Sequence, residues 1–381
     1  MTTTLHLAVQ PSHTTALRRC PRCALPASFP GIRFDATGVC NYCTYHGLFA
    51  ERLQTFKDQL KHEFERVVDE VKKSRRAYDC ILCYSGGKDS TFLLHLLKTK
   101  YDMNVLAYTM DNGFISPQAF RNIAKVVDCL GVDHLMFRPR SQMLKTIFRE
   151  ALTNRELFSK ALVPYANQCC LSCIAMVLSI ALKTGREKGI PLVVIGFTPG
   201  QAADVGIESF MKTGSTMFFA KDVSRDDPLD FPKMIRDPLY ELVGDEVDQF
   251  LIKSQYLEEG EEYPRVLYPY HAMVEYDEEA IYETIAQYGW SAPRDTDACS
   301  TNCRLNSVAI VSHVNQRQFH PYIAEMSCLV REGKMTFDEA VKRERLLANP
   351  GVIQDVLSKL DIAPERIGLV PDAGGVDRAE K

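Results

Sequence analysis

Hydrophobic and polar positions within residues 77–265 form two kinds of segment that follow one another along the chain. Short apolar runs typical of buried strands occur at Asp79–Tyr84, Asn104–Met110, His134–Arg138 and Pro191–Gly196. In the segments between them, apolar residues recur every three or four positions, which predicts helices over Thr91–Lys100, Pro117–Leu130 and Gln168–Lys188. This alternation predicts an α/β fold, a doubly wound parallel sheet that binds its ligands at the carboxyl ends of the strands.

The flanking segments have other patterns. Residues 49–76 are interpreted as a helical connector packed on the α/β domain, because their apolar residues recur at helical spacing. These apolar residues are Leu53, Phe56, Leu60, Phe64, Val67, Val68 and Val71. Residues 266–370 are predicted to be mostly helical, and the charged run Lys342–Arg345 is interpreted as a solvated helix face. Residues 1–18 are expected to form a flexible tail and residues 371–381 a disordered one.

Composition narrows the class of protein. With 381 residues, 46% of them hydrophobic, the chain can bury a sizeable core. The net charge of −4 disfavours a large RNA such as tRNA as the substrate and favours a small molecule. We find no apolar run near the roughly 20 residues that span a bilayer and no secretory signal, so we expect a cytoplasmic protein without a membrane partner.

Thirteen cysteines are many for a cytoplasmic chain, in which clustered thiols indicate a metal or catalysis more often than disulfides. Two CxxC pairs, Cys20/Cys23 and Cys40/Cys43, are separated by 16 residues. This spacing predicts a four-cysteine Zn²⁺ site in a zinc-ribbon module over residues 19–48. A site closed by four thiolates has a structural role. Cys80, Cys83 and Cys129 are interpreted as core residues.

The stretch Cys83–Thr91, CYSGGKDST, stands where a strand should end and a helix begin. Such a turn exposes unpaired backbone N–H groups, which together with the helix dipole bind anions. We predict that this site binds phosphate through Ser85, Gly86, Gly87, Lys88, Asp89, Ser90 and Thr91. The spacing of a Walker A loop is absent, so hydrolysis at the γ-phosphate is not the expected chemistry.

Residues 85–90 resemble the SGGxDS loop of the PP-loop ATP pyrophosphatases, the adenine nucleotide alpha-hydrolase-like superfamily. The resemblance implies that the loop holds the β- and γ-phosphates of ATP with Mg²⁺, and that a substrate oxygen attacks the α-phosphorus to give an adenylate and pyrophosphate. It assigns catalytic roles to Lys88 and Asp89. Asp111 and Gly196, at the ends of later strands, are further ATP-binding candidates, although Asp111 is equally an ordinary turn residue. Ile235–Leu239 resembles the R-P-L turn of the family.

Two further resemblances suggest different nucleophiles. The run Cys20–Cys43 followed by the loop resembles the N-acetyl sugar amidotransferases, which use ammonia from a glutaminase partner. Cys170 and Cys173, at the start of a helix, resemble the central CxxC of the tRNA thiolation enzymes, in which a third, downstream cysteine completes the ligand set of a [4Fe-4S] cluster. Here Cys299 or Cys303 would be that third ligand. Core packing, a second zinc site and a persulfide relay are the alternatives for these cysteines.

The leading hypothesis is therefore ATP-dependent adenylation of a small substrate, followed by exchange of its oxygen for sulfur from a sulfur donor. The substrate would be a nucleobase, a metabolite or a nucleotide-linked sugar. The alternatives are an amidotransferase with a glutaminase partner and a non-catalytic ATP-binding scaffold. Residues 196–204 depart from the sequence pattern of the tRNA thiolation enzymes. Trp290 and the aromatic residues between 263 and 276 are interpreted as packing residues. The sequence leaves open whether the chain forms a homo-oligomer.

Overall fold

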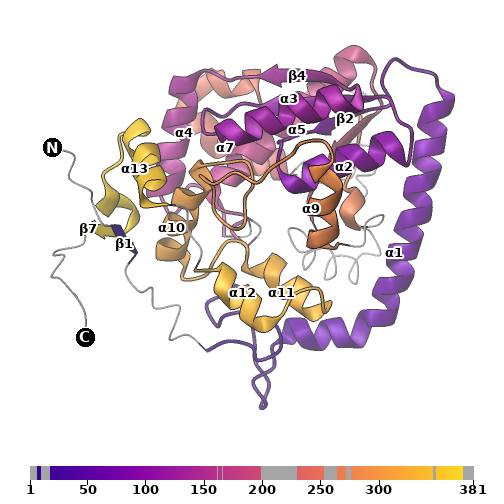
Figure 1. Cartoon of the computed structure of the whole chain (residues 1–381). Coiled ribbons are helices and arrows are strands. Elements are labelled where there is room, and N and C mark those ends of the chain that lie inside the picture. The colour runs from indigo at the N-terminus through magenta and orange to yellow at the C-terminus, as the bar shows by residue number, and fades with distance from the viewer. Residues whose placement is uncertain are drawn as a thin grey trace.

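The structure is a computed structural model of the chain, and it describes residues 7–9, 18–160, 162–164, 166–198, 230–252, 264–271, 276–345 and 349–371. Its centre is a five-stranded sheet in the order β4-β3-β2-β5-β6, with every pair of neighbours parallel (Figure 1). The strands are β2 (Cys80–Cys83), β3 (Val105–Met110), β4 (Asp133–Phe137), β5 (Leu192–Ile195) and β6 (Arg265–Leu267).

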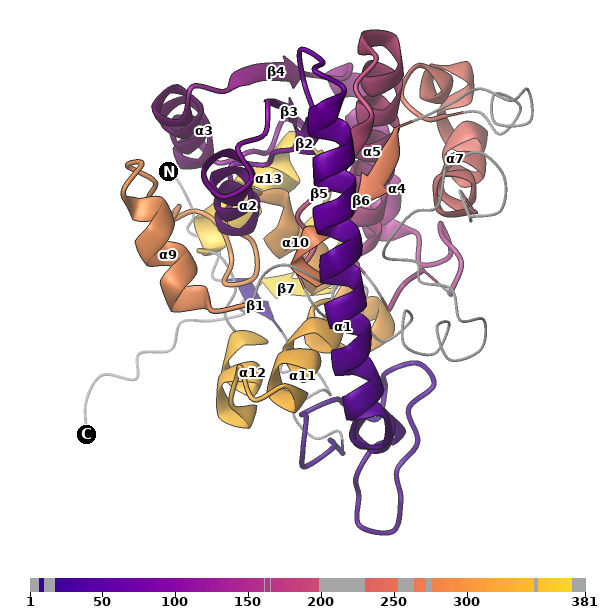
Figure 2. The ribbon, with the colours of Figure 1, turned by 90° about the vertical axis from the view of Figure 1, so that its right-hand side faces the viewer.

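Neighbouring residues of β2, β3, β5 and β6 belong alternately to two separate cores. Cys80 and Leu82 of β2 lie in the core formed with α1 (Asn41–Lys73), α2 (Lys88–Thr99), α3 (Pro117–Leu130) and α9 (Glu278–Ala286). Ile81 and Cys83 lie in the core formed with α4 (Ser141–Thr153), α5 (Gln168–Lys188), α7 (Asp230–Val243) and α10 (Leu305–Arg317). Figure 2 shows the sheet between these two layers. The predicted doubly wound α/β fold is thus confirmed.

The observed elements differ from the predicted ones at a few places. Helices α3 and α5 have the predicted bounds, whereas α4 and β6 were not predicted. Helix α2 begins at Lys88, three residues before the predicted start, because Gly87 is its N-cap. Ile235–Leu239 does not form a turn: it lies inside α7, which continues through Pro238. Cys80 and Cys83 are buried as expected, but Cys129 is exposed.

Helix α5 corrects the expectation about apolar runs. Its 21 residues are long and apolar enough to span a membrane by length and composition, with a mean hydropathy of 1.5. In the structure, 67% of that apolar window is buried inside the protein. Its hydrophobicity is therefore explained by packing between the sheet and the helices around it.

The N-terminal module packs on the C-terminal helices. Cys20 and Phe29 share a core with Ile323 of α11 (Ile323–Arg331) and Ala340 of α12 (Phe337–Arg343), and the module lies below these helices in Figure 1. Helix α1 leaves the module directly, since it begins at Asn41. Its residues Phe64, Val67, Val68 and Val71 pack on the sheet layer, whereas the side chains of Leu53, Phe56 and Leu60 lie outside the described part of the structure.

The remaining elements are short or peripheral. Strand β1 (Leu7–Val9) pairs antiparallel with β7 (Leu369–Pro371), so a segment early in the chain lies beside a late one. The others are α13 (Pro350–Lys359) and the 3₁₀ turns η2 (Gly244–Gln249), η3 (Pro269–His271) and η4 (Pro364–Ile367). The rest of the predicted tails, residues 1–6, 10–17 and 372–381, lies outside the described residues.

Candidate functional site

The glycine-rich loop connects the end of β2 to the start of α2, as the sequence predicts. Gly86 has a φ of +75°, and a Cβ atom there would lie 2.6 Å from Cγ1 of Ile123 and 3.0 Å from the Ala119 carbonyl oxygen. Only glycine fits this position without strain. Gly87 caps α2 without a side-chain hydrogen bond, so the first amides of the helix face the loop.

Hydroxyl and aromatic side chains hold the loop in shape. The Thr91 hydroxyl donates to the Gly87 carbonyl at 2.7 Å, and the hydroxyls of Ser85 and Ser90 lie 3.1 Å apart. The indole N–H of Trp290 donates to the Gly86 carbonyl at 3.0 Å, so this residue binds the loop as well as packing. Gly196, at the end of β5, faces the same loop: a Cβ on it would lie 3.5 Å from Cα of Ser90. Residues 199–204, which follow it, lie outside the described part of the chain.

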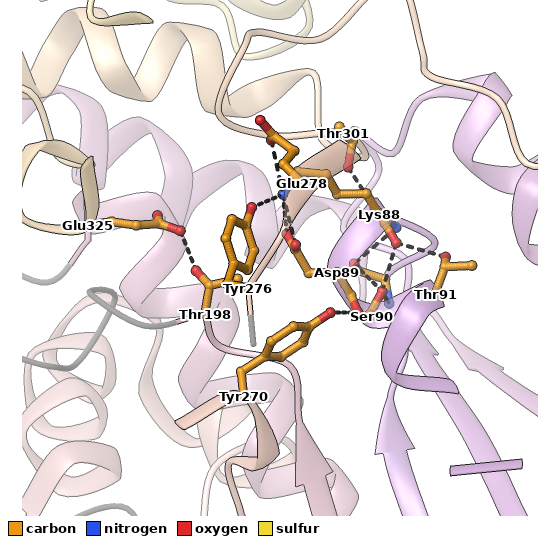
Figure 3. Close-up of polar contacts among 12 residues, drawn as sticks. Lys88, Asp89, Ser90, Thr91, Thr198, Tyr270, Tyr276, Glu278, Thr301 and Glu325 are labelled. Atoms are coloured by element: carbon orange, nitrogen blue, oxygen red, sulfur yellow. Dashed lines mark hydrogen bonds and ion pairs between the residues drawn. The ribbon is translucent and has the colours of Figure 1, made fainter. Parts of the chain in front are cut away.

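Lys88 is buried beneath the loop, and its ammonium group is surrounded by oxygen atoms (Figure 3). Its Nζ lies 2.8 and 2.9 Å from the two carboxylate oxygens of Asp89, 2.7 Å from the Tyr276 hydroxyl and 3.5 Å from Oε1 of Glu278. Burial by itself would lower the pKa of Lys88, but Asp89, Tyr276 and Glu278 together raise it well above its ordinary value. The lysine is therefore a fixed positive charge at the start of α2.

The C-terminal helices extend this polar network. Arg343 of α12 donates two hydrogen bonds to the carboxylate of Glu278, so the interpretation of the Lys342–Arg345 run as a solvated face was wrong for Arg343. On α11, Glu325 accepts a hydrogen bond from the Thr198 hydroxyl at the end of β5. The Tyr270 hydroxyl donates to the Asp89 carbonyl at 2.7 Å. The loop is thus held by residues that follow the sheet in sequence.

Three of the four candidate cluster cysteines face one another beside the loop. The amide Nδ2 of Asn112 lies 3.8 Å from the sulfur of Cys173 and 3.6 Å from that of Cys303. The Cys303 thiol also acts electrostatically on both Cys170 and Cys173. The charges that act on the Cys299 thiol are those of Asp297, Glu325, Arg343 and Lys88. The structure thus brings Cys303 to the central CxxC, where Asn112 lies between its sulfur and that of Cys173.

Burial is the main influence on this thiol trio (Cys170, Cys173 and Cys303). Burial raises the pKa of Cys170 to about 12 and also raises that of Cys173 and Cys303, so three thiolates here would need a cation to hold them. The Asn112 amide points at two of the sulfurs, as hydrogen-bond donors do around iron–sulfur clusters.

The N-terminal cysteines have the geometry of a single-ion site. The sulfurs of Cys20, Cys23, Cys40 and Cys43 all lie within 4.8 Å of one another and are buried. The Cys20–Cys43 and Cys23–Cys40 sulfur pairs are 3.7 and 3.6 Å apart. Four sulfurs at about 2.3 Å from a tetrahedral zinc would be about 3.8 Å apart. Hydrogen bonds from Cys40 and Cys43 lower the pKa of Cys23, which favours a thiolate in the group.

Asp111 lies at the carboxyl end of β3, the strand next to β2. Its carboxylate accepts hydrogen bonds from Nε of Arg138 at 2.6 Å and from the Gly113 amide at 2.8 Å. The second of these bonds is that of a turn residue, as the alternative interpretation of Asp111 expected. The hydrogen bond from Arg138 holds this exposed side chain at the same edge of the sheet as the loop.

Sequence reasoning missed several residues of the site. Tyr276 and Glu278 reach Lys88, Thr301 reaches the Lys88 amide, and Arg343 holds Glu278, but none belongs to a motif and each is of an ordinary surface type. The aromatic cluster was interpreted as packing, yet Tyr270 and Tyr276 both hydrogen-bond to the loop residues; Tyr263 and residues 272–275 lie outside the described chain. No local spacing signal could have found these residues.

Comparison with known proteins gives distant similarities. No family model matches the chain. An uncharacterized protein from Methanocaldococcus jannaschii is 24% identical over 303 residues, which cover 80% of this chain and 84% of that protein.

Solved structures with partial similarity include a U34-tRNA thiolase from Methanococcus maripaludis with its [4Fe-4S] cluster (12% identity, 96% of this chain and 94% of that chain covered, TM-score 0.35). Another is an NMN synthetase from Francisella tularensis (10% identity, 82% of this chain and 97% of that chain covered, TM-score 0.34). A third is an NH₃-dependent NAD synthetase from Campylobacter jejuni (14% identity, 54% of this chain and 80% of that chain covered, TM-score 0.27). At such TM-scores, the case for this chain's activity lies in the geometry of its own residues.

Proposed function

We propose that the chain is an enzyme of the PP-loop ATP pyrophosphatase type that adenylates a carbonyl or amide oxygen of a small substrate and then replaces that oxygen with sulfur. The observation that supports it is the meeting of two sites at one edge of the sheet. The loop before α2 lies beside the thiol trio, and the segment 297–304 touches both, through Thr301 at the loop and through Cys303 in the trio.

The first reaction would use the loop. The substrate oxygen attacks the α-phosphorus of ATP, a new P–O bond forms, and the bond to the β-phosphate breaks to release pyrophosphate. The backbone amides at the start of α2 and the charge of Lys88 would stabilise the leaving pyrophosphate. Asp89 would be the carboxylate for Mg²⁺, which requires it to turn away from Lys88.

The second reaction would use the thiol trio. A sulfur nucleophile attacks the activated carbon, the C–S bond forms, and the C–O bond to AMP breaks. A [4Fe-4S] cluster held by Cys170, Cys173 and Cys303 would leave one iron free to bind the sulfur. The Asn112 amide would donate to two of the ligating sulfurs. The net negative charge of the chain favours a nucleobase, metabolite or nucleotide-linked sugar over tRNA as the substrate.

A second candidate function is transfer of nitrogen. The four-cysteine module at the N-terminus is the feature that resembles the N-acetyl sugar amidotransferases, and the proposed adenylation would be the same. Ammonia from a glutaminase partner would then displace AMP. A third candidate, an ATP-binding scaffold, would need neither Asp89 nor the thiol trio.

The test is the content of iron, acid-labile sulfide and zinc in anaerobically purified protein. We expect about four irons and four sulfides beside one zinc per chain in the wild type. Cys303→Ala should lose the iron and keep the zinc, whereas Cys299→Ala, its matched control, should keep both. Zinc alone in all three proteins would contradict the cluster and favour nitrogen transfer.

Pyrophosphate release separates the enzyme from the scaffold. It should require Lys88, so Lys88→Ala should lose it, whereas Lys98→Ala, at the other end of the same helix, should retain it. Turnover that is unchanged in Lys88→Ala would contradict the catalytic assignment.

A further inference from the structure

The segment Asp297–Arg304 lies against the loop at the point where phosphates are expected. The backbone N–H of Lys88 donates a hydrogen bond of 2.9 Å to the hydroxyl oxygen of Thr301 (Figure 3). A Cβ atom on Gly87 would lie 3.0 Å from the same oxygen and 3.6 Å from Oδ1 of Asn302. The Thr301 hydroxyl therefore fills the space over the first amides of α2.

Other contacts hold this segment in place without Thr301. The Ser116 amide donates to the Asn302 carbonyl at 2.8 Å, and the Arg304 amide donates to the Phe114 carbonyl at 2.9 Å. These two bonds flank the bridge between Ile115 and Cys303. The hydroxyl of Thr301 can thus leave the loop by a side-chain rotation while the backbone of the segment stays attached to the residues that follow β3.

The buried carboxylate of Asp297 stiffens the start of the segment. It accepts hydrogen bonds from the amides of Cys299 and Ser300 at 2.8 and 2.9 Å, and from Nδ2 of Asn306 at 3.0 Å. A segment held at both ends presents Thr301 to the loop in one position. The contact is therefore a built feature of the site and not a chance approach of a surface side chain.

In this arrangement the protein itself occupies two anion-binding groups of the loop. The Lys88 amide binds Thr301, and the Lys88 ammonium binds Asp89, Tyr276 and Glu278. A helix N-terminal amide that is buried without an acceptor is unfavourable, so a neutral hydroxyl is a suitable partner in the absence of nucleotide. A phosphate oxygen is a stronger acceptor because its bond to the amide is charge-assisted.

We propose that Thr301 is a residue of the nucleotide site, whose hydroxyl occupies a phosphate position on the Lys88 amide and is displaced when ATP binds. The inference rests on the proposed function, since it takes the loop as the triphosphate site. It adds a residue 213 positions away from Lys88 that opposes nucleotide binding. Because Thr301 lies two residues before Cys303, the same segment connects the nucleotide site to the thiol trio.

The test is the affinity of the full-length, iron-free protein for α,β-methylene-ATP with Mg²⁺, measured by calorimetry. Thr301→Val keeps the shape of the side chain but removes the acceptor, so we expect it to bind the analogue about 5-fold more tightly, the factor that one net hydrogen bond contributes. Thr301→Ser keeps the hydroxyl and should bind as the wild type does. An unchanged or weaker affinity of Thr301→Val would overturn the proposal; damage to the fold cannot produce the expected gain.

Lys88→Ala separates this inference from the proposed function. If Lys88→Ala loses the analogue while Thr301→Val binds it as the wild type does, the loop is the nucleotide site and only the role of Thr301 is wrong. If the wild type and Lys88→Ala bind alike, or neither binds, both proposals fail. An unfolding curve for each variant shows whether a lost affinity reflects a lost fold.

Discussion

The carboxylate of Glu278 makes the arrangement around Lys88 testable by a substitution that changes charge and little else. Glu278 lies in the first turn of α9, accepts two hydrogen bonds from Arg343 and has Oε1 3.5 Å from Nζ of Lys88. Burial by itself would raise the pKa of Glu278, but Arg343 and Lys88 lower it below its ordinary value. The carboxylate is therefore ionised at neutral pH, and Glu278→Gln removes one negative charge from between two cations.

The size of the effect follows from this geometry. Two unit charges 3.5 Å apart interact by about 5 kcal/mol at an effective dielectric constant of about 20. Desolvation offsets much of this, so we expect Glu278→Gln to lower the free energy of unfolding by about 2 kcal/mol. In a double-mutant cycle with Lys88→Met, the two substitutions should couple by about 1 to 2 kcal/mol.

Urea unfolding followed by circular dichroism measures both quantities. Glu279→Gln is the matched control, because Glu279 is exposed in the same turn of α9 and should show little effect. Additive effects of Glu278→Gln and Lys88→Met, to within about 0.5 kcal/mol, would refute the proposed contact between the two side chains. A loss in Glu279→Gln as large as that in Glu278→Gln would show that only the helix terminus is being perturbed.

Three further predictions concern the loop, the module and the core. Gly86→Ala should lower the free energy of unfolding by about 2 to 4 kcal/mol, because it adds a 2.6 Å clash with Ile123 to the strain of a φ of +75°. The control is Gly131→Ala, whose φ is +59° and whose added Cβ would have no atom within 4 Å, so it should show the strain alone, about 1 kcal/mol. Equal losses in the two variants would contradict the clash. Cys43→Ser should reduce zinc from about one to none per chain and expose residues 18–40 to limited proteolysis, whereas Cys129→Ser should change neither; retained zinc would argue against the four-sulfur site. Burial, with smaller effects of His320 and Arg317, lowers the pKa of His313 to about 3 from an ordinary 6.5. Between pH 6.5 and about pH 3 the unfolded chain therefore binds a proton that the folded chain does not. The free energy of unfolding should fall by about 1.4 kcal/mol for each unit by which the pH decreases in this range. Urea unfolding of His313→Gln should show a shallower decline, and an identical pH profile would count against that assignment.

Much of the fold could be predicted because its signals are local in sequence. Helices α3 and α5 have regular apolar spacing over 14 and 21 residues, and the strands beside them are short apolar runs. The loop before α2 is a continuous stretch in which backbone geometry requires glycine at Gly86. The four N-terminal cysteines come in two close pairs, so a short folded segment is enough to bring their sulfurs together. Helix α4 has the same kind of spacing and could have been found.

The sequence by itself therefore determined the α/β class, the position of the loop and the four-cysteine group, because each follows from local patterns in the sequence, such as two close cysteine pairs 16 residues apart. Only the tertiary structure decided that Cys303 meets Cys173 at Asn112, since Cys299 and Cys303 are equivalent by spacing. It also decided that Tyr276, 188 positions from Lys88, and Thr301 contact the loop. Such contacts arise from how the C-terminal segments pack over the sheet, and side chains of ordinary type give no sign of that packing in the sequence.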